Sequence, residues 1–438
     1  MSISIKNLMK HSSYLFAGGI GSMVLRFAQN IFVARALGAE LLGVWSTIVS
    51  FSVIVSSFFA FRTQEALTRY LVEFRIKNES EKIRLLLATA IITDIASNII
   101  PFLFIVIFSP IIATNLAQGQ AQPILFILYA TSFLARSFDN TWYCVARDLK
   151  RLGKQSLRQI VITFVQVALI SILYFVQLLN LYTMTILISF ISIVNFIVVI
   201  IFLNQELKEG YNIKIMSLPW HNYFKSFRQL NQFWNFMFST YISTTFSSLI
   251  KNIDILILGA FTSNKEVGIY QLAKTLSSFL QVGTQSLTSI IYQDFNELIA
   301  NRQTQKIIQE LKRISLKLIP ILTLTMILVF LLIYPFILFF YGEEFIKSYP
   351  LFIIISLAFT VSLILFWAQA LILSLDYHRY RVKVIMLSFF IELFFMLVFL
   401  PNFGSFAMAV ITSVNMVCIN LVFAVKAVKE VRNIIYKT

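Results

Sequence analysis

Long apolar runs, separated by short polar or charged breaks, extend along the whole 438-residue chain. A helix that crosses a lipid bilayer needs about 20 predominantly apolar residues. Charged residues make up 13% of the chain, whereas a soluble domain carries about 25%. Hydrophobic residues make up 58%, and the mean hydropathy is +0.81. We therefore predict an all-α polytopic membrane protein, whose length is divided among helices rather than globular domains.

The apolar runs predict about twelve transmembrane helices. Their approximate spans are 12–35, 41–62, 82–109, 122–146, 156–178, 181–203, 228–260, 266–290, 311–340, 349–375, 380–400 and 404–426. The loops expected on the outer side are short, which argues against a folded external domain.

Lysine and arginine are concentrated on alternate loops. The termini, loops and adjoining helix ends on one side hold 29 of the 36 basic residues, the opposite ends hold Arg35, Lys265 and Lys347, and four lie further inside predicted spans. Because an excess of basic residues marks the cytoplasmic side, both termini are expected in the cytoplasm. The net charge of +16 is thereby explained by topology, and no nucleic-acid partner is predicted.

Motifs for enzymatic or metal chemistry are weak. The two cysteines, Cys144 and Cys418, lie in separate apolar runs, and the three histidines lie in predicted cytoplasmic segments. The only Gly-Lys pair, at 153–154, lacks the upstream glycine of a nucleotide-binding loop. We expect no catalytic residue, metal site or cofactor, so the energy for transport would come from a proton, sodium or substrate gradient.

The second half of the chain repeats the first at a constant offset. When the halves are aligned without a gap, Arg26 falls on Lys251 and Gly43 falls on Gly268. Both halves begin on the same side of the membrane, which indicates a parallel repeat of six plus six helices. The expected lobes are residues 1–205 and 225–438, joined by a cytoplasmic linker at 206–224.

Two segments carry a family resemblance: ARALGAELLGVWSTIVSF at 34–51 and NIDILILGAFTSNKEVGIYQLAKTLSSF at 252–279. They contain the patterns L-G-x-E-x-x-G-x-W and D-x-L-x-L-G…E-V-G-x-Y. They resemble the first two helices of each lobe in Wzx-type, O-antigen-translocating polysaccharide flippases. These proteins belong to the multidrug/oligosaccharidyl-lipid/polysaccharide exporter superfamily. In length, helix count and repeat, the resemblance covers nearly the whole chain.

The resemblance implies a MATE-like fold, with a central cavity that opens to one side of the membrane at a time. It implies transport of an undecaprenyl-pyrophosphate-linked oligosaccharide across the bacterial inner membrane, from the cytoplasmic to the outer leaflet. Membrane lipids and polysaccharide assembly proteins are further expected partners. Lipid II flippases usually have fourteen helices, so the count of twelve favours the O-antigen or capsule branch.

Four cations lie inside the predicted spans: Arg26, Arg136, Lys251 and Lys274. Charges at this depth are costly and mark functional sites. Guanidinium and ammonium groups bind phosphate oxygens, so these four are candidates to bind the pyrophosphate. Arg26 and Lys251 are expected to face each other across the cavity. Candidate polar and aromatic contacts to the sugars are Gln29, Asn30, Asn140, Trp142 and Trp367.

Four acids near these cations keep a second interpretation open. The i, i+3 spacing would allow Asp254 to pair with Lys251, and Asp139 to pair with Arg136. Arg26 or Lys274 could instead form an interhelical salt bridge, for example with Asp94. Asp94 and Glu392 lie in mid-span, where carboxylates either couple transport to ions or pair structurally.

Three other functions fit the chain less well. A MATE-type drug exporter should favour cationic drugs through acids, whereas the clearest intramembrane charges here are cations. A major-facilitator transporter would carry a characteristic loop between helices two and three, and FRTQEALTRYLVEFRIK stands there instead. A polysaccharide polymerase or glycosyltransferase would need a larger external loop.

Overall fold

The computed structural model describes residues 5–61, 63–116, 119–279, 291, 295–296, 298–299 and 304–437. Throughout these ranges the chain forms α-helices and short 3₁₀ turns, with no strand. The predicted all-α class is confirmed.

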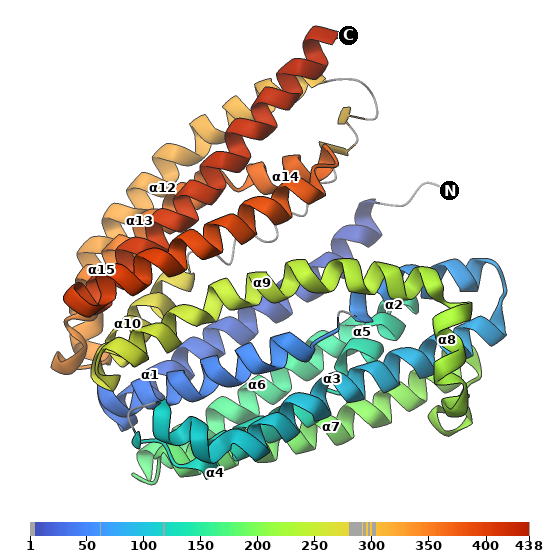
Figure 1. Cartoon of the computed structure of the whole chain (residues 1–438), viewed down its shortest axis with the longest axis horizontal. Coiled ribbons are helices and arrows are strands. Elements are labelled where there is room, and N and C mark those ends of the chain that lie inside the picture. Colours follow the sequence, from blue (N-terminus) through green and yellow to red (C-terminus); the bar gives the residue numbers. More distant parts are fainter. Residues whose placement is uncertain are drawn as a thin grey trace. The chain divides into compact units, whose positions relative to one another are not determined.

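The chain divides into two compact units (Figure 1). Unit 1 comprises Met1–Leu37 and Thr47–Ile253, and unit 2 comprises Gly38–Ser46 and Asp254–Thr438. The segment at 206–224 lies within unit 1. The lobe boundaries expected from the repeat remain a prediction.

Unit 1 contains most of the first nine helices. These are α1 (Ile5–Phe59, of which Gly38–Ser46 belongs to unit 2), α2 (Thr63–Ile76), α3 (Ser80–Asn115), α4 (Pro123–Leu134), α5 (Asp139–Asp148), α6 (Leu152–Phe175), α7 (Leu181–Tyr211), α8 (Tyr223–Gln229) and α9 (Asn231–Phe261, of which the part from Asp254 onward belongs to unit 2). Helix α4 packs against α3 and α7, and α2 packs against α3 and α5. The core around them includes the fully buried Trp142 and Phe233.

Unit 2 contains α10 (Asn264–Ser278), α12 (Thr304–Phe340), α13 (Ser348–Ile364), α14 (Trp367–Ser374) and α15 (His378–Lys437). Helix α13 packs against α10, α12 and α15, and α14 packs against α15. A buried cluster that includes Trp367, Leu371 and Phe423 fills the space between α14 and the end of α15.

Most of the predicted spans match these helices. Within the described ranges, seven helices are long and apolar enough to cross a membrane, and the bent pair α13 and α14 would make an eighth. Helices α1 and α15 each contain two arms, because non-helical glycines interrupt them at Gly38 and Gly404. The span expected at 122–146 is broken into α4 and α5. The span expected at 266–290 begins with α10, and residues 280–290 lie outside the described ranges.

Equivalent helices of the two halves begin at positions that are separated by the same number of residues as the aligned sequence positions. The first residues of α4 and α13, Pro123 and Ser348, are separated by the same offset as Arg26 and Lys251. The starts of α6 and α15, at Leu152 and His378, depart from that offset by a single position. Both members of the fourth helix pair are broken midway, into α4 and α5 in one half and α13 and α14 in the other. The helix starts and the break in the fourth helix therefore match between the two halves, which supports a duplication.

Two equivalent glycines bring the helix backbones of the two repeats into direct contact within unit 2. A Cβ atom on Gly43 would lie 1.8 Å from the carbonyl oxygen of Asn264, and one on Gly268 would lie 1.9 Å from that of Ala39. Ala39 and Asn264 are themselves equivalent positions of the two repeats. The contact is therefore reciprocal, and it explains why both motifs contain a glycine at this position.

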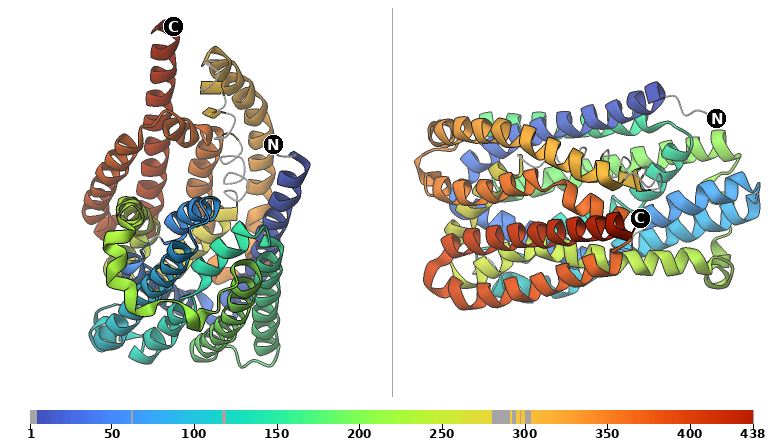
Figure 2. Two further views of the ribbon diagram at one scale, coloured as in Figure 1. Left: turned by 90° about the vertical axis from the view of Figure 1, so that its right-hand side faces the viewer. Right: turned by 90° about the horizontal axis from the view of Figure 1, so that it is seen from above.

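Helix α15 folds back on itself (Figures 1 and 2). Gly404, which follows Pro401, adopts φ 52° and ψ −137° between the two arms, a conformation that glycine tolerates and other residues avoid. The Glu266 carboxylate of α10 accepts a hydrogen bond from the Ser405 backbone N–H at 3.0 Å. The glutamate of the E-V-G-x-Y motif thus stabilises the start of the second arm.

Candidate functional site

Two intramembrane arginines lie near one another in unit 1. Arg26 is on the first arm of α1, and Arg136 is in the turn between α4 and α5; both side chains are exposed. Their charges act on each other and on the buried Tyr129 of α4. The turn that breaks the fourth span thus places Arg136 within electrostatic range of Arg26.

Neither arginine forms an ion pair with a carboxylate in the part of the chain that the structure describes. Arg136 does not pair with Asp139, although the i, i+3 spacing would allow it. Beside Arg26 on α1, Gln29 and Asn30 are half-buried and Ser22 is buried. Two like charges without an acidic partner repel each other, so this group suits an anionic ligand.

Asp139 has a different partner, Arg158 of α6. The Arg158 Nη1 atom donates to Asp139 Oδ1 and to Asn195 Oδ1, both at 2.8 Å. Its guanidinium also lies over the Trp142 ring, 4.7 Å from the centroid. The Arg158 side chain is only 12% exposed. Asp139 therefore takes part in a structural pair that joins α5, α6 and α7.

Asp94 lies at the centre of a hydrogen-bond network in unit 1. It is fully buried on α3, and its carboxylate accepts hydrogen bonds from Thr63, from Thr141 at 3.0 Å and from Asn140 at 3.3 Å. These donors belong to α2 and α5. The network satisfies the carboxylate with neutral groups and ties three helices together.

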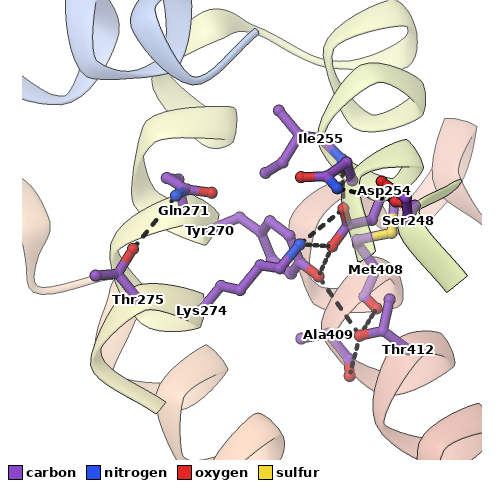
Figure 3. Close-up of polar contacts among 11 residues, drawn as sticks. Ser248, Asp254, Ile255, Tyr270, Gln271, Lys274, Thr275, Met408, Ala409 and Thr412 are labelled. Atoms are coloured by element: carbon purple, nitrogen blue, oxygen red, sulfur yellow. Dashed lines mark hydrogen bonds and ion pairs between the residues drawn. The ribbon is translucent and has the colours of Figure 1, made fainter. Parts of the chain in front are cut away.

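Unit 2 contains a buried ion pair, drawn in Figure 3. The Lys274 ammonium of α10 donates to both carboxylate oxygens of Asp254 on α9, at 2.9 and 2.7 Å. The Tyr270 hydroxyl donates to the same carboxylate at 2.8 Å, and lies 3.5 Å from the Thr412 hydroxyl of α15. Asp254 is 2% exposed. The ammonium partner of Asp254 is therefore a lysine on the neighbouring helix.

A second buried carboxylate lies within electrostatic range of this pair. Glu392, on the first arm of α15, is 3% exposed and accepts a hydrogen bond from Asn415 of the second arm at 2.5 Å. The charges of Asp254 and Lys274 both act on it. Two buried carboxylates thus lie within electrostatic range of one ammonium group.

The remaining sequence candidates fall in two places. Lys251 is exposed on α9, and its expected position opposite Arg26 across a cavity remains a prediction. Trp142 and Trp367 are buried in the hydrophobic cores of units 1 and 2. Neither indole is accessible to a sugar in this structure, because packing against neighbouring helices covers both rings.

Several residues that pair with the intramembrane charges do not stand out in the sequence. The basic pattern assigns Arg158 to a loop, although it lies two turns into α6. Tyr270 stands out in the sequence only as part of the E-V-G-x-Y motif, and its contact with Asp254 follows from the alignment of α9 and α10. No signal in the sequence singles out Asn415. Within the described ranges, no group of three or more His, Cys, Asp or Glu side chains could hold a metal ion.

Comparison with known proteins gives one family match. The family described as "Polysaccharide biosynthesis protein" matches residues 8–292. Comparison with curated proteins gives no match.

Solved structures with a similar fold include transporters and a flippase. A point mutant of the Vibrio cholerae MATE transporter VcmN is 13% identical, with a TM-score of 0.66 and coverage of 98% of this chain and 97% of that one. The lipid II flippase MurJ, in an inward closed conformation, is 14% identical, with a TM-score of 0.68 and coverage of 96% and 87%. A MOP-superfamily transporter from Pyrococcus furiosus, described as having a binding pocket of reverse polarity, is 13% identical, with a TM-score of 0.63 and coverage of 98% and 96%.

Proposed function

This chain belongs to the polysaccharide biosynthesis protein family, and we propose that it is a flippase for a lipid-linked oligosaccharide. The substrate is an undecaprenyl-pyrophosphate-linked repeat unit of O-antigen or another surface polysaccharide. The protein moves it across the bacterial inner membrane by alternating access, with both termini in the cytoplasm. The fold shared with MATE transporters and MurJ supports transport as the class of activity.

The observation that supports an anionic substrate is the pair of exposed arginines in unit 1. Arg26 and Arg136 lie within electrostatic range and have no carboxylate partner among the described residues. A pyrophosphate would relieve their repulsion and accept paired hydrogen bonds from both guanidinium groups. Lys251, the repeat equivalent of Arg26, supplies a third exposed cation. Gln29 and Asn30 are the proposed sugar contacts on the same helix.

Lys274 has a conditional role in this proposal. While Asp254 is ionised, it engages the Lys274 ammonium with two hydrogen bonds. When a proton or sodium ion binds at Asp254, Lys274 loses its anionic partner and becomes available to the pyrophosphate. The charge of Glu392, within electrostatic range of Asp254, favours that binding. Ion binding in unit 2 is thereby coupled to the strength with which the substrate is held.

Export of a cationic drug is the second candidate function, because buried acids are present in unit 2. These acids already have partners: Asp254 binds Lys274, and Glu392 accepts a hydrogen bond from Asn415. The exposed intramembrane charges are Arg26, Arg136 and Lys251. These three cations repel a cation, so this alternative is disfavoured.

Transport by the purified protein in proteoliposomes distinguishes the two functions. We expect it to move a fluorescent undecaprenyl-pyrophosphate-linked oligosaccharide between leaflets, and to leave a lipophilic cationic dye untransported. Transport of the dye alone would favour the drug exporter. Sugar transfer or chain growth by the protein would instead indicate a polymerase or glycosyltransferase.

A further inference from the structure

The two arms of α15 line a groove that the proposed site does not use. It has a volume of about 870 Å³, and its lining is apolar except for a few side chains. Along the first arm the lining residues recur every three or four positions, as Leu387, Ile391, Phe395, Phe399 and Phe403 do. This spacing places them on one helical face. The second arm contributes the opposite wall.

Most of these side chains are not covered by protein. Leu387 is 63% exposed, Phe403 is 60% exposed and Val414 of the second arm is 55% exposed. In a bilayer, an apolar concave surface of this kind is filled by hydrocarbon. The occupant of the groove is therefore a lipid chain.

The length of the groove selects the kind of chain. Its lining extends from Tyr380 to Phe403 along the first arm, which is about 35 Å at 1.5 Å per residue. The hydrocarbon core of a bilayer is about 30 Å thick, so an acyl chain from one leaflet reaches about half of it. A groove that runs through both leaflets fits a longer chain, such as a polyprenyl chain.

One end of the groove is cationic. Lys383 lines this end and is exposed. The neighbouring Lys426 lies near the Tyr380 ring but is already paired with Glu430, at 2.6 Å. Lys383 is therefore placed to meet the phosphate of a lipid whose chain lies in the groove.

The one acid in the lining does not oppose this assignment. The Glu392 carboxylate is buried and accepts a hydrogen bond from Asn415 of the opposite arm. This bond joins the two arms partway along the groove. Glu392 therefore contributes to the floor of the groove rather than presenting a free charge to its occupant.

We propose that the groove between the arms of α15 binds the polyprenyl chain of a phosphate-linked polyprenyl lipid, with the phosphate end entering beside Lys383. The inference rests on the proposed function, because it identifies where the lipid part of that substrate binds.

Photocrosslinking to the full-length protein in proteoliposomes tests the proposal. The probe is undecaprenyl phosphate with a diazirine in its chain, and the comparison lipid is phosphatidylglycerol with a diazirine in one acyl chain. We expect the polyprenyl probe to label groove residues at least fivefold more than the phospholipid probe at equal mole fraction. Equal labelling by both probes would overturn the proposal.

A matched pair of substitutions on the first arm makes the test specific. Leu387→Trp fills the groove, whereas Leu397→Trp adds the same bulk at a position that is 51% exposed and outside the lining. We expect Leu387→Trp to reduce labelling by the polyprenyl probe at least fivefold, and Leu397→Trp to leave it within twofold. Equal loss in both variants would contradict the proposal.

Lys383→Gln provides a readout that does not depend on the bulk of a tryptophan. It should weaken labelling by the polyprenyl phosphate probe severalfold and leave labelling by an uncharged polyprenol probe unchanged. An unchanged response to both probes would overturn the phosphate contact. Because labelling requires no translocation, a labelled groove without transport contradicts the flippase function alone. Transport without groove labelling contradicts this inference alone.

Discussion

Lys274 donates two hydrogen bonds to the buried carboxylate of Asp254, across the turn between α9 and α10. At the offset of the repeat, the positions equivalent to Asp254 and Lys274 are Gln29 and Val49. The ion pair is therefore confined to one repeat. The first repeat carries Arg26 without an acidic partner among the described residues. The proposed phosphate site therefore includes a residue of the first repeat, and the proposed ion site lies in the second.

The Asp254–Lys274 pair should stabilise the protein as a unit. Asp254→Asn or Lys274→Met should each destabilise it by about 3 kcal/mol, because each leaves one group of a largely buried pair without its partner. The double variant should be less destabilised than the two losses added together. Melting temperatures of the purified protein in detergent measure this coupling. Strictly additive losses would show that the two residues do not interact.

The backbone crossing at Gly43 and Gly268 should not tolerate a methyl group. Gly43→Ala places a Cβ atom 1.8 Å from a carbonyl oxygen, so α1 and α10 must separate. We expect a melting temperature lower by several degrees, measured together with the amount of monodisperse protein. Gly21→Ala on the same helix is the control, because a Cβ atom there meets nothing within 4 Å. Equal stability of the two variants would contradict the crossing.

The apolar runs predicted much of the fold. The predicted spans at 122–146 and 181–203 begin within one residue of α4 and α7. The polar residues before each span also separate these helices from the preceding ones, α3 and α6. The partners of the intramembrane charges could not be predicted, because they depend on how neighbouring helices align. Asp139 therefore pairs with Arg158 rather than with the residue three positions away.

The groove of α15 was also beyond prediction from the sequence. Its phenylalanine-rich faces look like any lipid-facing helix, and only the backbone break at Gly404 turns the two faces toward each other. The turn that places Arg136 near Arg26 could not be predicted either, because the break between α4 and α5 interrupts an apolar run that resembles one span in the sequence.

Arg158 should be a structural residue rather than a substrate contact. Arg158→Ala leaves Asp139 and Asn195 without their guanidinium partner and should lower the melting temperature by several degrees. Arg151→Ala is the control, because Arg151 pairs with Glu209 on a more exposed surface, where ion pairs contribute little. A fall in transport for Arg158→Ala without any loss of stability would contradict this assignment.

Glu392 should affect the coupling of transport to an ion gradient. Glu392→Gln preserves size and the capacity to bind Asn415 but removes the charge beside Asp254 and Lys274. We expect the initial rate of transport in proteoliposomes to lose its dependence on an imposed proton or sodium gradient. Glu343→Gln, at an exposed position, should retain that dependence. Unchanged gradient dependence in Glu392→Gln would place the coupling ion elsewhere.

In the proposed function, unit 1 holds the pyrophosphate through Arg26 and Arg136. Charge-assisted hydrogen bonds contribute about 1.5–3 kcal/mol each, so losing one should slow transport roughly tenfold or more. The control is Arg35→Ala, an exposed arginine on the same arm of α1.

The most direct measurement is the rate at which purified variants move undecaprenyl-pyrophosphate-linked oligosaccharide between the leaflets of proteoliposomes. We predict that Arg26→Ala and Arg136→Ala each lose at least tenfold in rate at normal melting temperatures, that Arg26→Lys retains part of it, and that Arg35→Ala is unaffected. Unchanged rates in both Arg26→Ala and Arg136→Ala would show that these arginines do not hold the pyrophosphate.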